Sequence, residues 1–165
     1  MGLDNIPHQY PCSTKGTAVL VPRLDREGKA YVQEDGTPVM SIDCQATQAC
    51  GGCQWKNAEP PTGGRVLGIM GTDCWYRGKY GNALIEQYGG YDEIEGYSFY
   101  GSNADGDYKT ATECLGLAEH IDGIIESTDW DMGSEQQDRD CAGLEYAAWW
   151  LRWVAAEADG TDCWY

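Results

Sequence analysis

The sequence predicts an α+β fold, in which a small mixed or antiparallel sheet is covered by two to three helices. Short β-rich runs separated by turn residues occupy the first hundred residues. Two long segments near the C-terminus have helical periodicity and follow capping boxes. A stretch with three cysteines, Cys44 to Cys53, adds a metal-stapled β lobe to this picture.

The cysteine-rich stretch is the sharpest chemical signal. Cys50 and Cys53 flank two glycines, so a tight turn can direct both thiolates at one ion. Cys44 lies just upstream, and a hairpin between Cys12 and Cys44 would bring Cys12 back as the fourth ligand. Four sulfurs suit the tetrahedral coordination of Zn²⁺. We therefore predict a zinc-ribbon-like lobe over residues 1–58 with a structural zinc ion. Free thiols and disulfides are the alternatives.

Turn and strand signals divide this lobe. Residues 1–16 are expected to be irregular because they contain Pro7, Pro11 and Gly16. Turns are expected at residues 25–28 and at Asp35-Gly36. The intervening β-rich runs predict three strands, over residues 17–21, 30–33 and 38–42.

A loop over residues 57–64, with Pro60-Pro61 and Gly63-Gly64, marks the boundary to an α+β core over residues 65–165. The core is expected to pack with the lobe as one compact unit. It should contain strands over 65–70 and 97–100 and a helix over 78–88.

The first long helix is predicted to begin after Thr110. Thr110-x-x-Glu113 is a capping box, in which the Thr oxygen and the Glu carboxylate accept hydrogen bonds from reciprocal backbone amides. Its expected core stripe, at helical spacing, consists of Ala111, Cys114, Leu115, Ala118, Ile121 and Ile125.

The last helix is predicted from the capping box Ser134-x-x-Gln137 to about Ala158, where Asp159-Gly160 stops it. One apolar stripe runs from Cys141 to Ala158 through leucines and alanines. A second stripe is aromatic, and consists of Tyr146, Trp149, Trp150 and Trp153. Two apolar faces predict an aromatic-rich core helix, with a partner on the second face as the alternative.

A hexapeptide occurs twice. Gly71-Thr72-Asp73-Cys74-Trp75-Tyr76 recurs as Gly160-Thr161-Asp162-Cys163-Trp164-Tyr165. Both copies alternate like short strands, and we expect them to pair with each other or with the strand over 97–100, the second copy docking the chain end into the sheet. Cys74 and Cys163 are expected to be buried thiols, with a second metal half-site as the alternative.

Acidic charge is concentrated in one segment. The formal net charge is −16, and residues 92–140 hold fourteen acidic residues against Lys109 and Arg139. Nucleic-acid-binding surfaces carry the opposite sign, so no direct nucleic-acid binding is expected. No apolar run is long enough to cross a membrane, and no signal-peptide pattern is visible. We therefore expect a cytoplasmic protein with reduced cysteines.

Candidates for catalysis are few. A cysteine nucleophile needs a histidine to form its thiolate, and the chain contains only His8 and His120. His120 lies in the acidic helix and is expected to be a helix-surface residue. A small metal-dependent enzyme would need Cys50 and Cys53, a third ligand and an open coordination position.

Three features together resemble small accessory proteins carried by bacteriophages, particularly of actinobacteria. They are residues 1–7, the Glu113-Cys114-Leu115 segment, and the Trp-rich last helix that runs into a short terminal strand. The resemblance implies a protein that acts by binding a host or viral protein. It implies no established activity and no site residues.

The charge distribution predicts a non-enzymatic interaction protein whose acidic surface binds a basic surface of another protein. A phage anti-defence inhibitor or a nucleic-acid mimic is one specific version, and the host cytoplasm would be its location. The acidic residues expected to bind the partner are Asp107, Glu113, Glu119, Asp122, Glu126, Asp129 and Asp131.

Two other functions stay open. A structural or virion-associated assembly protein would use the aromatic face of the last helix, at Trp149 and Trp153, and could form homo-oligomers through it. A small metal-dependent enzyme is the second alternative.

Overall fold

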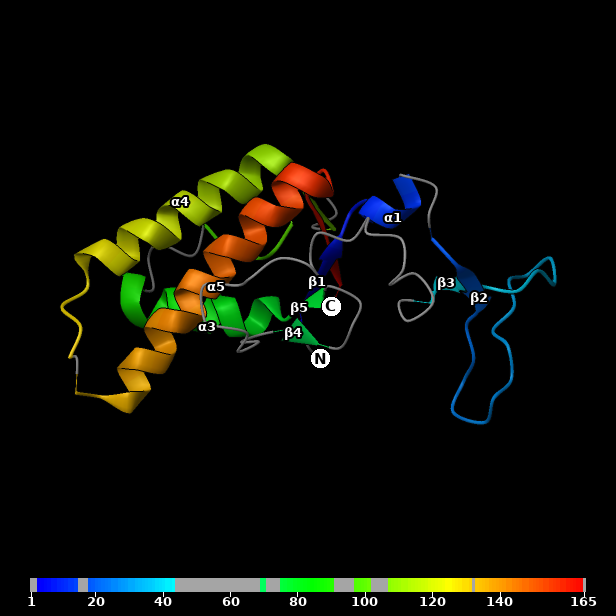
Figure 1. Cartoon of the computed structure of the whole chain (residues 1–165), viewed down its shortest axis with the longest axis horizontal. Coiled ribbons are helices and arrows are strands. Elements are labelled where there is room, and N and C mark those ends of the chain that lie inside the picture. The colour runs from blue at the N-terminus through cyan, green and yellow to red at the C-terminus, as the bar shows by residue number, and fades with distance from the viewer. Residues whose placement is uncertain are drawn as a thin grey trace. The chain divides into compact units, whose positions relative to one another are not determined.

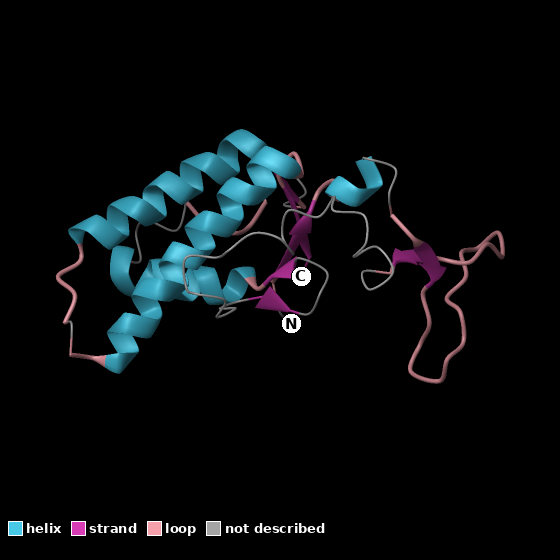
Figure 2. Cartoon of the chain, in the orientation of Figure 1, coloured by secondary structure: helices cyan, strands magenta, loops and turns pink. Residues whose placement is uncertain are grey.

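The computed structural model describes residues 3–14, 18–43, 69–70, 75–90, 97–101, 107–131 and 133–164. It has the predicted α+β class (Figure 1, Figure 2). The chain divides into two compact units. The core unit comprises Met1–Tyr10 and Ala58–Tyr165, and the meander unit comprises Pro11–Asn57.

The core unit contains a five-stranded sheet in the order β4-β5-β1-β7-β6. Every neighbouring pair of strands is antiparallel. The strands are β1 (Asp4–Pro7), β4 (Ile69–Met70), β5 (Trp75–Tyr76), β6 (Tyr108–Lys109) and β7 (Thr161–Trp164).

Strand β1 is the central strand of this sheet, so the expectation of an irregular segment over residues 1–16 is wrong. Asn5 lies opposite Tyr76 of β5 on one side and opposite Cys163 of β7 on the other. These ladders join the first ten residues to the core unit, whereas the predicted lobe over 1–58 placed them with the meander. A second element of this segment is the short helix α1 (Pro11–Thr14).

The two copies of the hexapeptide flank β1 and, in the described residues, pair with it and not with each other. The first copy supplies β5, and the second supplies β7, which docks the end of the chain into the sheet as expected. The predicted strand over 97–100 is wrong, because these residues form bends. The Phe99 carbonyl accepts a hydrogen bond from the Asn5 side chain (2.8 Å), a side-chain contact in place of a β-ladder.

The three long helices match their predictions. They are α3 (Gly78–Gly89), α4 (Ala111–Ser127) and α5 (Glu135–Glu157). Thr110 and Glu113 form the predicted capping box. Ser134 caps α5 by accepting from the Gln137 amide at 3.4 Å, but the Gln137 side chain accepts from the Asp131 amide at 2.7 Å. The second capping box is therefore only half formed. Its Ser134 half caps α5, whereas the Gln137 side chain links the α4–α5 connection to the helix.

Helix α5 packs against Tyr76 on the inner face of the sheet, the face that carries Asn5, Tyr76, Thr161 and Cys163. These four side chains are at most 2 % exposed. The Tyr76 ring stacks on Trp150 of α5, with centroids 5.2 Å apart. Helix α4 packs along α5. The prediction of an aromatic-rich core helix for α5 is confirmed, because Tyr146, Trp150 and Trp153 are all buried.

The predicted core stripe of α4 is rotated in the structure. Leu115 is 45 % exposed and Ile125 is half-buried, while Leu117 and Ile124 are buried. Cys114, Ala118 and Ile121 are buried as expected. Apolar residues occur on more than one side of this helix, so its periodicity allowed two neighbouring faces, and packing against α5 selected one.

Three backbone hydrogen bonds in the meander unit form a closed cycle, the junction at which its three arms meet. Arg23 N–H donates to the Val39 carbonyl, Val39 N–H to the Tyr31 carbonyl, and Tyr31 N–H to the Arg23 carbonyl, at 2.8–2.9 Å. Strands β2 (Leu20–Pro22) and β3 (Met40–Ile42) form one arm of the junction. The other arms are hairpins closed by single bridges, so the predicted middle strand over 30–33 is reduced to bridging residues.

Both predicted turns of the meander are confirmed. Gly28 and Gly36 each have a φ of 83°, a conformation that glycine adopts without a steric penalty. Asp25 accepts from two backbone amides of the first turn, and Asp35 accepts from Thr37 in the second. Over residues 18–43 no residue is buried, so local hydrogen bonds define these arms.

The zinc-ribbon part of the fold prediction is not supported. Cys12 lies in α1 and is buried, whereas Cys44, Cys50 and Cys53 lie outside the described residues. The part of the chain that the structure describes contains no group of three or more His, Cys, Asp or Glu residues suited to a metal ion. Zinc binding by the four cysteines stays a prediction from the sequence.

Candidate functional site

The outer face of the sheet, opposite the inner face, is formed by Trp75, Tyr108, Asp162 and Trp164. Successive strand residues point to opposite faces, and directly opposite residues share one. Tyr108 lies opposite Asp162, and Asp162 and Trp164 alternate with the buried Thr161 and Cys163. The register therefore collects aromatic and acidic side chains on one side of a thin sheet.

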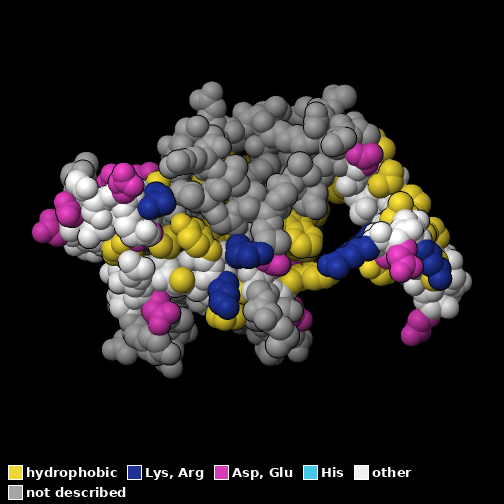
Figure 3. Space-filling model, turned by 90° about the horizontal axis from the view of Figure 1, so that it is seen from below, with side chains coloured by type: hydrophobic (Ala, Val, Ile, Leu, Met, Phe, Trp, Pro, Cys, Tyr) yellow, Lys and Arg dark blue, Asp and Glu magenta, His cyan; other side chains and the backbone are white. Residues whose placement is uncertain are grey.

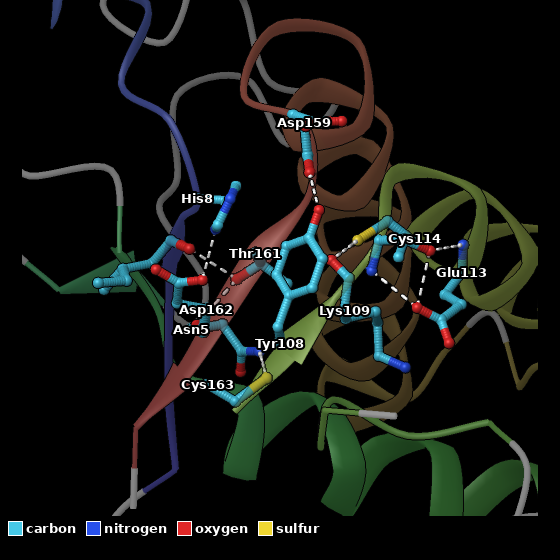
Figure 4. Close-up of polar contacts among 12 residues, drawn as sticks. Asn5, His8, Tyr108, Lys109, Glu113, Cys114, Asp159, Thr161, Asp162 and Cys163 are labelled. Atoms are coloured by element: carbon cyan, nitrogen blue, oxygen red, sulfur yellow. Dashed lines mark hydrogen bonds and ion pairs between the residues drawn. The ribbon is translucent and has the colours of Figure 1, made fainter. Parts of the chain in front are cut away.

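His8 joins this face directly after β1. Its Nδ1 atom lies 2.7 Å from a carboxylate oxygen of Asp162, and its ring packs against Tyr108 with centroids 4.4 Å apart. The Tyr108 hydroxyl donates to the Asp159 carbonyl at 2.6 Å, which fixes the ring from its far end (Figure 4). The His8 amide donates to the Gly160 carbonyl at 3.0 Å. The Asp162 carboxylate is thus oriented by His8. His8 is itself held by its backbone hydrogen bond to Gly160 and by the packing of its ring against Tyr108.

An open hollow of about 540 Å³ lies at the β6–β7 side of the sheet. It is lined by Asp107, Tyr108, Asp162, Cys163 and Trp164. The Trp164 side chain is 54 % exposed. Two acidic and two aromatic residues therefore line the hollow.

The outer face continues from the hollow toward β5. Trp164 contacts Trp75 with ring centroids 6.3 Å apart. Trp75 is anchored in turn by a hydrogen bond from its Nε1 to the Tyr10 hydroxyl at 2.9 Å. Because Trp75 and Trp164 occupy the same position in the two copies of the hexapeptide, the repeat places one tryptophan on each side of β1.

Lys109 does not neutralise this acidic group from the same side. It lies opposite the buried Thr161 in the register and is only 4 % exposed. In Figure 4 its side chain extends away from His8 and Asp162.

Buried thiols occupy the inner side of the site. Burial raises the pKa of Cys114 to about 12 and the pKa of Cys163 to about 11, partly offset by the positive charge of Lys109. Cys163 also accepts a hydrogen bond from Asn5 Nδ2 at 3.3 Å and donates to the Phe99 carbonyl at 3.3 Å. A thiolate is the reactive form of cysteine, so neither thiol is a nucleophile at neutral pH.

We expect Cys114 and Cys163 to resist alkylation in the folded protein. Both thiols are protonated at pH 8, because their pKa values of about 12 and 11 lie well above it. Iodoacetamide labelling at pH 8, mapped by peptide mass spectrometry, should be at least about tenfold slower at these positions than in urea. Equal labelling rates with and without urea would contradict the burial of the thiols.

The predicted acidic residues do not form one group. Asp107 lines the hollow, and Glu113 uses its carboxylate to cap α4, accepting from the Thr110 amide at 2.7 Å. Asp122 forms an ion pair with Arg152 of α5. The remaining predicted acidic residues are exposed on α4 and on the connection that follows it, and are Glu119, Glu126, Asp129 and Asp131.

The two aromatic residues predicted to bind a partner differ in burial. Trp153 is 7 % exposed and belongs to the core, whereas Trp149 is half-buried and packs against Tyr146. His120 is half-buried, and its ring stacks on Tyr97 with centroids 4.3 Å apart.

The sequence did not predict that one face of the sheet would bring together His8, Trp75, Asp162 and Trp164. The repeated hexapeptide was the available signal, because it contains both tryptophans and Asp162. It could not show that the N-terminal strand would insert between the copies and bring His8 to Asp162, 154 residues away along the chain.

No protein-family model, curated protein or solved structure matches the chain. None of the described helices combines the length with the apolar character that a membrane span requires.

Proposed function

We propose that this protein is a non-enzymatic interaction protein that binds a basic surface of another protein. The observation that carries the proposal is the placement of acidic residues around α4. Glu119 and Glu126 are seven residues apart on one helical face and are both exposed. Asp129 and Asp131 continue the exposed acidic surface beyond the end of the helix.

Few basic residues counter this acidic surface. The only lysine and arginine in the sequence from 92 to 140 are Lys109, which is buried, and Arg139. Arg152 of α5 is committed to Asp122. Figure 3 shows acidic side chains at the left end of the view, where the α4–α5 connection lies in Figure 1. A surface of one charge sign attracts and orients a partner of the opposite sign.

A phage anti-defence inhibitor or a nucleic-acid mimic is the specific version we favour, because a basic site that normally holds nucleic acid would accept such a surface. The raised pKa values of the Cys114 and Cys163 thiols argue against catalysis by these two cysteines. Assembly through the last helix is the less favoured version, since the Trp153 side chain is committed to the core.

A deca-arginine peptide tests the acidic surface directly. Isothermal titration calorimetry should show binding at 50 mM NaCl that weakens at least about tenfold at 500 mM, because salt screens exposed charges. The Glu119→Gln/Glu126→Gln variant should weaken binding by about threefold or more at low salt.

The matched control is Glu27→Gln/Glu34→Gln. It removes the same charge from exposed positions of the meander unit and should leave the affinity within about twofold of wild type. Equal losses in both variants would show that net charge alone attracts the peptide. That result, or binding that is indifferent to salt, would overturn the proposal.

A further inference from the structure

We infer that the hollow at the β6–β7 side of the sheet holds an arginine side chain of the basic partner. This inference rests on the proposed function and names where the partner is anchored. The proposed site lies on the outer face of the sheet and is carried by β6 and β7. It is a second binding site besides the diffuse acidic surface of α4.

The carboxylates supply the first part of the argument. Asp107 and Asp162 both line the hollow. An ionised carboxylate only accepts hydrogen bonds, so the 2.7 Å contact with Asp162 requires His8 to donate through Nδ1. This contact fixes the orientation of the Asp162 carboxylate at the edge of the hollow. His8 is therefore a positioning residue for the carboxylate that would meet the guanidinium.

The aromatic rings supply the second part. Tyr108 and Trp164 line the same hollow, and the Trp164 ring is 54 % exposed. Cations are attracted to the faces of aromatic rings, and tryptophan is the strongest partner. Trp164 contacts Trp75, which in turn donates a hydrogen bond to the Tyr10 hydroxyl, so the Trp164 ring belongs to a connected aromatic group.

Together these groups select a guanidinium among cations. Arginine presents a planar fork of donors that matches a carboxylate and can stack on an aromatic ring at the same time. Lysine presents a compact ammonium that satisfies the charge but not the stacking. The hollow is open to solvent, which suits a side chain that arrives on the surface of a macromolecule.

The test uses the full chain and three peptides: deca-arginine, deca-lysine and deca-citrulline. Citrulline keeps the planar shape of arginine but has no charge. In ¹⁵N-labelled protein, deca-arginine should shift the indole signals of Trp75 and Trp164 among the seven tryptophans. It should bind at least threefold more tightly than deca-lysine, and deca-citrulline should not bind.

Two variants remove the two parts of the site separately. Trp164→Ala and Asp162→Asn should each weaken deca-arginine binding at least fivefold and abolish the preference over deca-lysine. Trp164→Phe keeps an aromatic ring and should retain most of the affinity, which controls for a folding defect. Glu119→Gln/Glu126→Gln should lower affinity without changing the arginine preference or the indole shifts.

The outcomes separate this inference from the function on which it rests. If deca-arginine binds in a salt-dependent way but Trp164→Ala and Asp162→Asn bind like wild type, the arginine site is wrong and the acidic surface stands. If no cationic peptide binds the wild-type protein, the proposed function itself is wrong. Equal binding of deca-citrulline would overturn recognition by charge.

Discussion

Replacing Trp150 with alanine is expected to lower the free energy of unfolding by roughly 3–5 kcal/mol. The side chain is 0 % exposed and its ring stacks on Tyr76, with centroids 5.2 Å apart. It links α5 to the inner face of the sheet, so its removal leaves a cavity where the two layers meet. Urea unfolding followed by far-UV circular dichroism measures the change.

Trp164→Ala is the matched control for this substitution. Trp164 is 54 % exposed and lies on the outer face, so its loss should cost less than about 1 kcal/mol. Trp150→Phe should retain part of the packing, with a cost between those of the two alanine variants. Similar losses for Trp150→Ala and Trp164→Ala would contradict the placement of Trp150 between α5 and the sheet.

Replacing Gly81 with alanine is expected to lower the free energy of unfolding by about 1–3 kcal/mol. A Cβ atom at this position of α3 would meet the Phe99 ring, with Cδ2 at 2.8 Å. The ring has no space to move into, because Phe99 is 0 % exposed and stacks on Tyr76 with centroids 4.8 Å apart. Thermal unfolding of the variant should show a lower midpoint than wild type.

Gly123→Ala is the control for Gly81→Ala. Gly123 lies in α4, and a Cβ atom there meets nothing within 4 Å. Alanine has the higher helix propensity, so the same chemical change should stabilise the protein by about 0.5–1 kcal/mol. A stabilising effect at both positions would show that α3 does not approach Phe99 as closely as the structure has it.

Local signals in the sequence predicted the helices well. The capping box at Thr110 and Glu113 is made by groups three residues apart, so the signal that starts α4 is visible in one short stretch. The same holds for the turn at Gly36 and for the end of α5, where Gly160 adopts a φ of 102°. In each case the deciding interactions join near neighbours in the chain.

The site was not predictable in the same way. His8 and Asp162 meet because β1 enters the sheet between two strands from distant parts of the chain. Strands β5 and β6 have two residues each, too few for an alternation pattern to reveal which side chain faces outward. The sequence predicted Asp107 only as an acidic surface residue, and the structure places it in the hollow with Tyr108 and Trp164.

The sequence by itself determined the α+β class, the three long helices and the acidic character of the segment that includes α4. These follow from periodicity, caps and charge, which act over a few residues. The tertiary structure decided that β1 is the central strand, that α4 buries Leu117 and Ile124, and that the repeated hexapeptide builds an aromatic and acidic outer face. The physical reason is that hydrogen-bonded register and side-chain packing join residues far apart in the chain, and local preferences leave those pairings open.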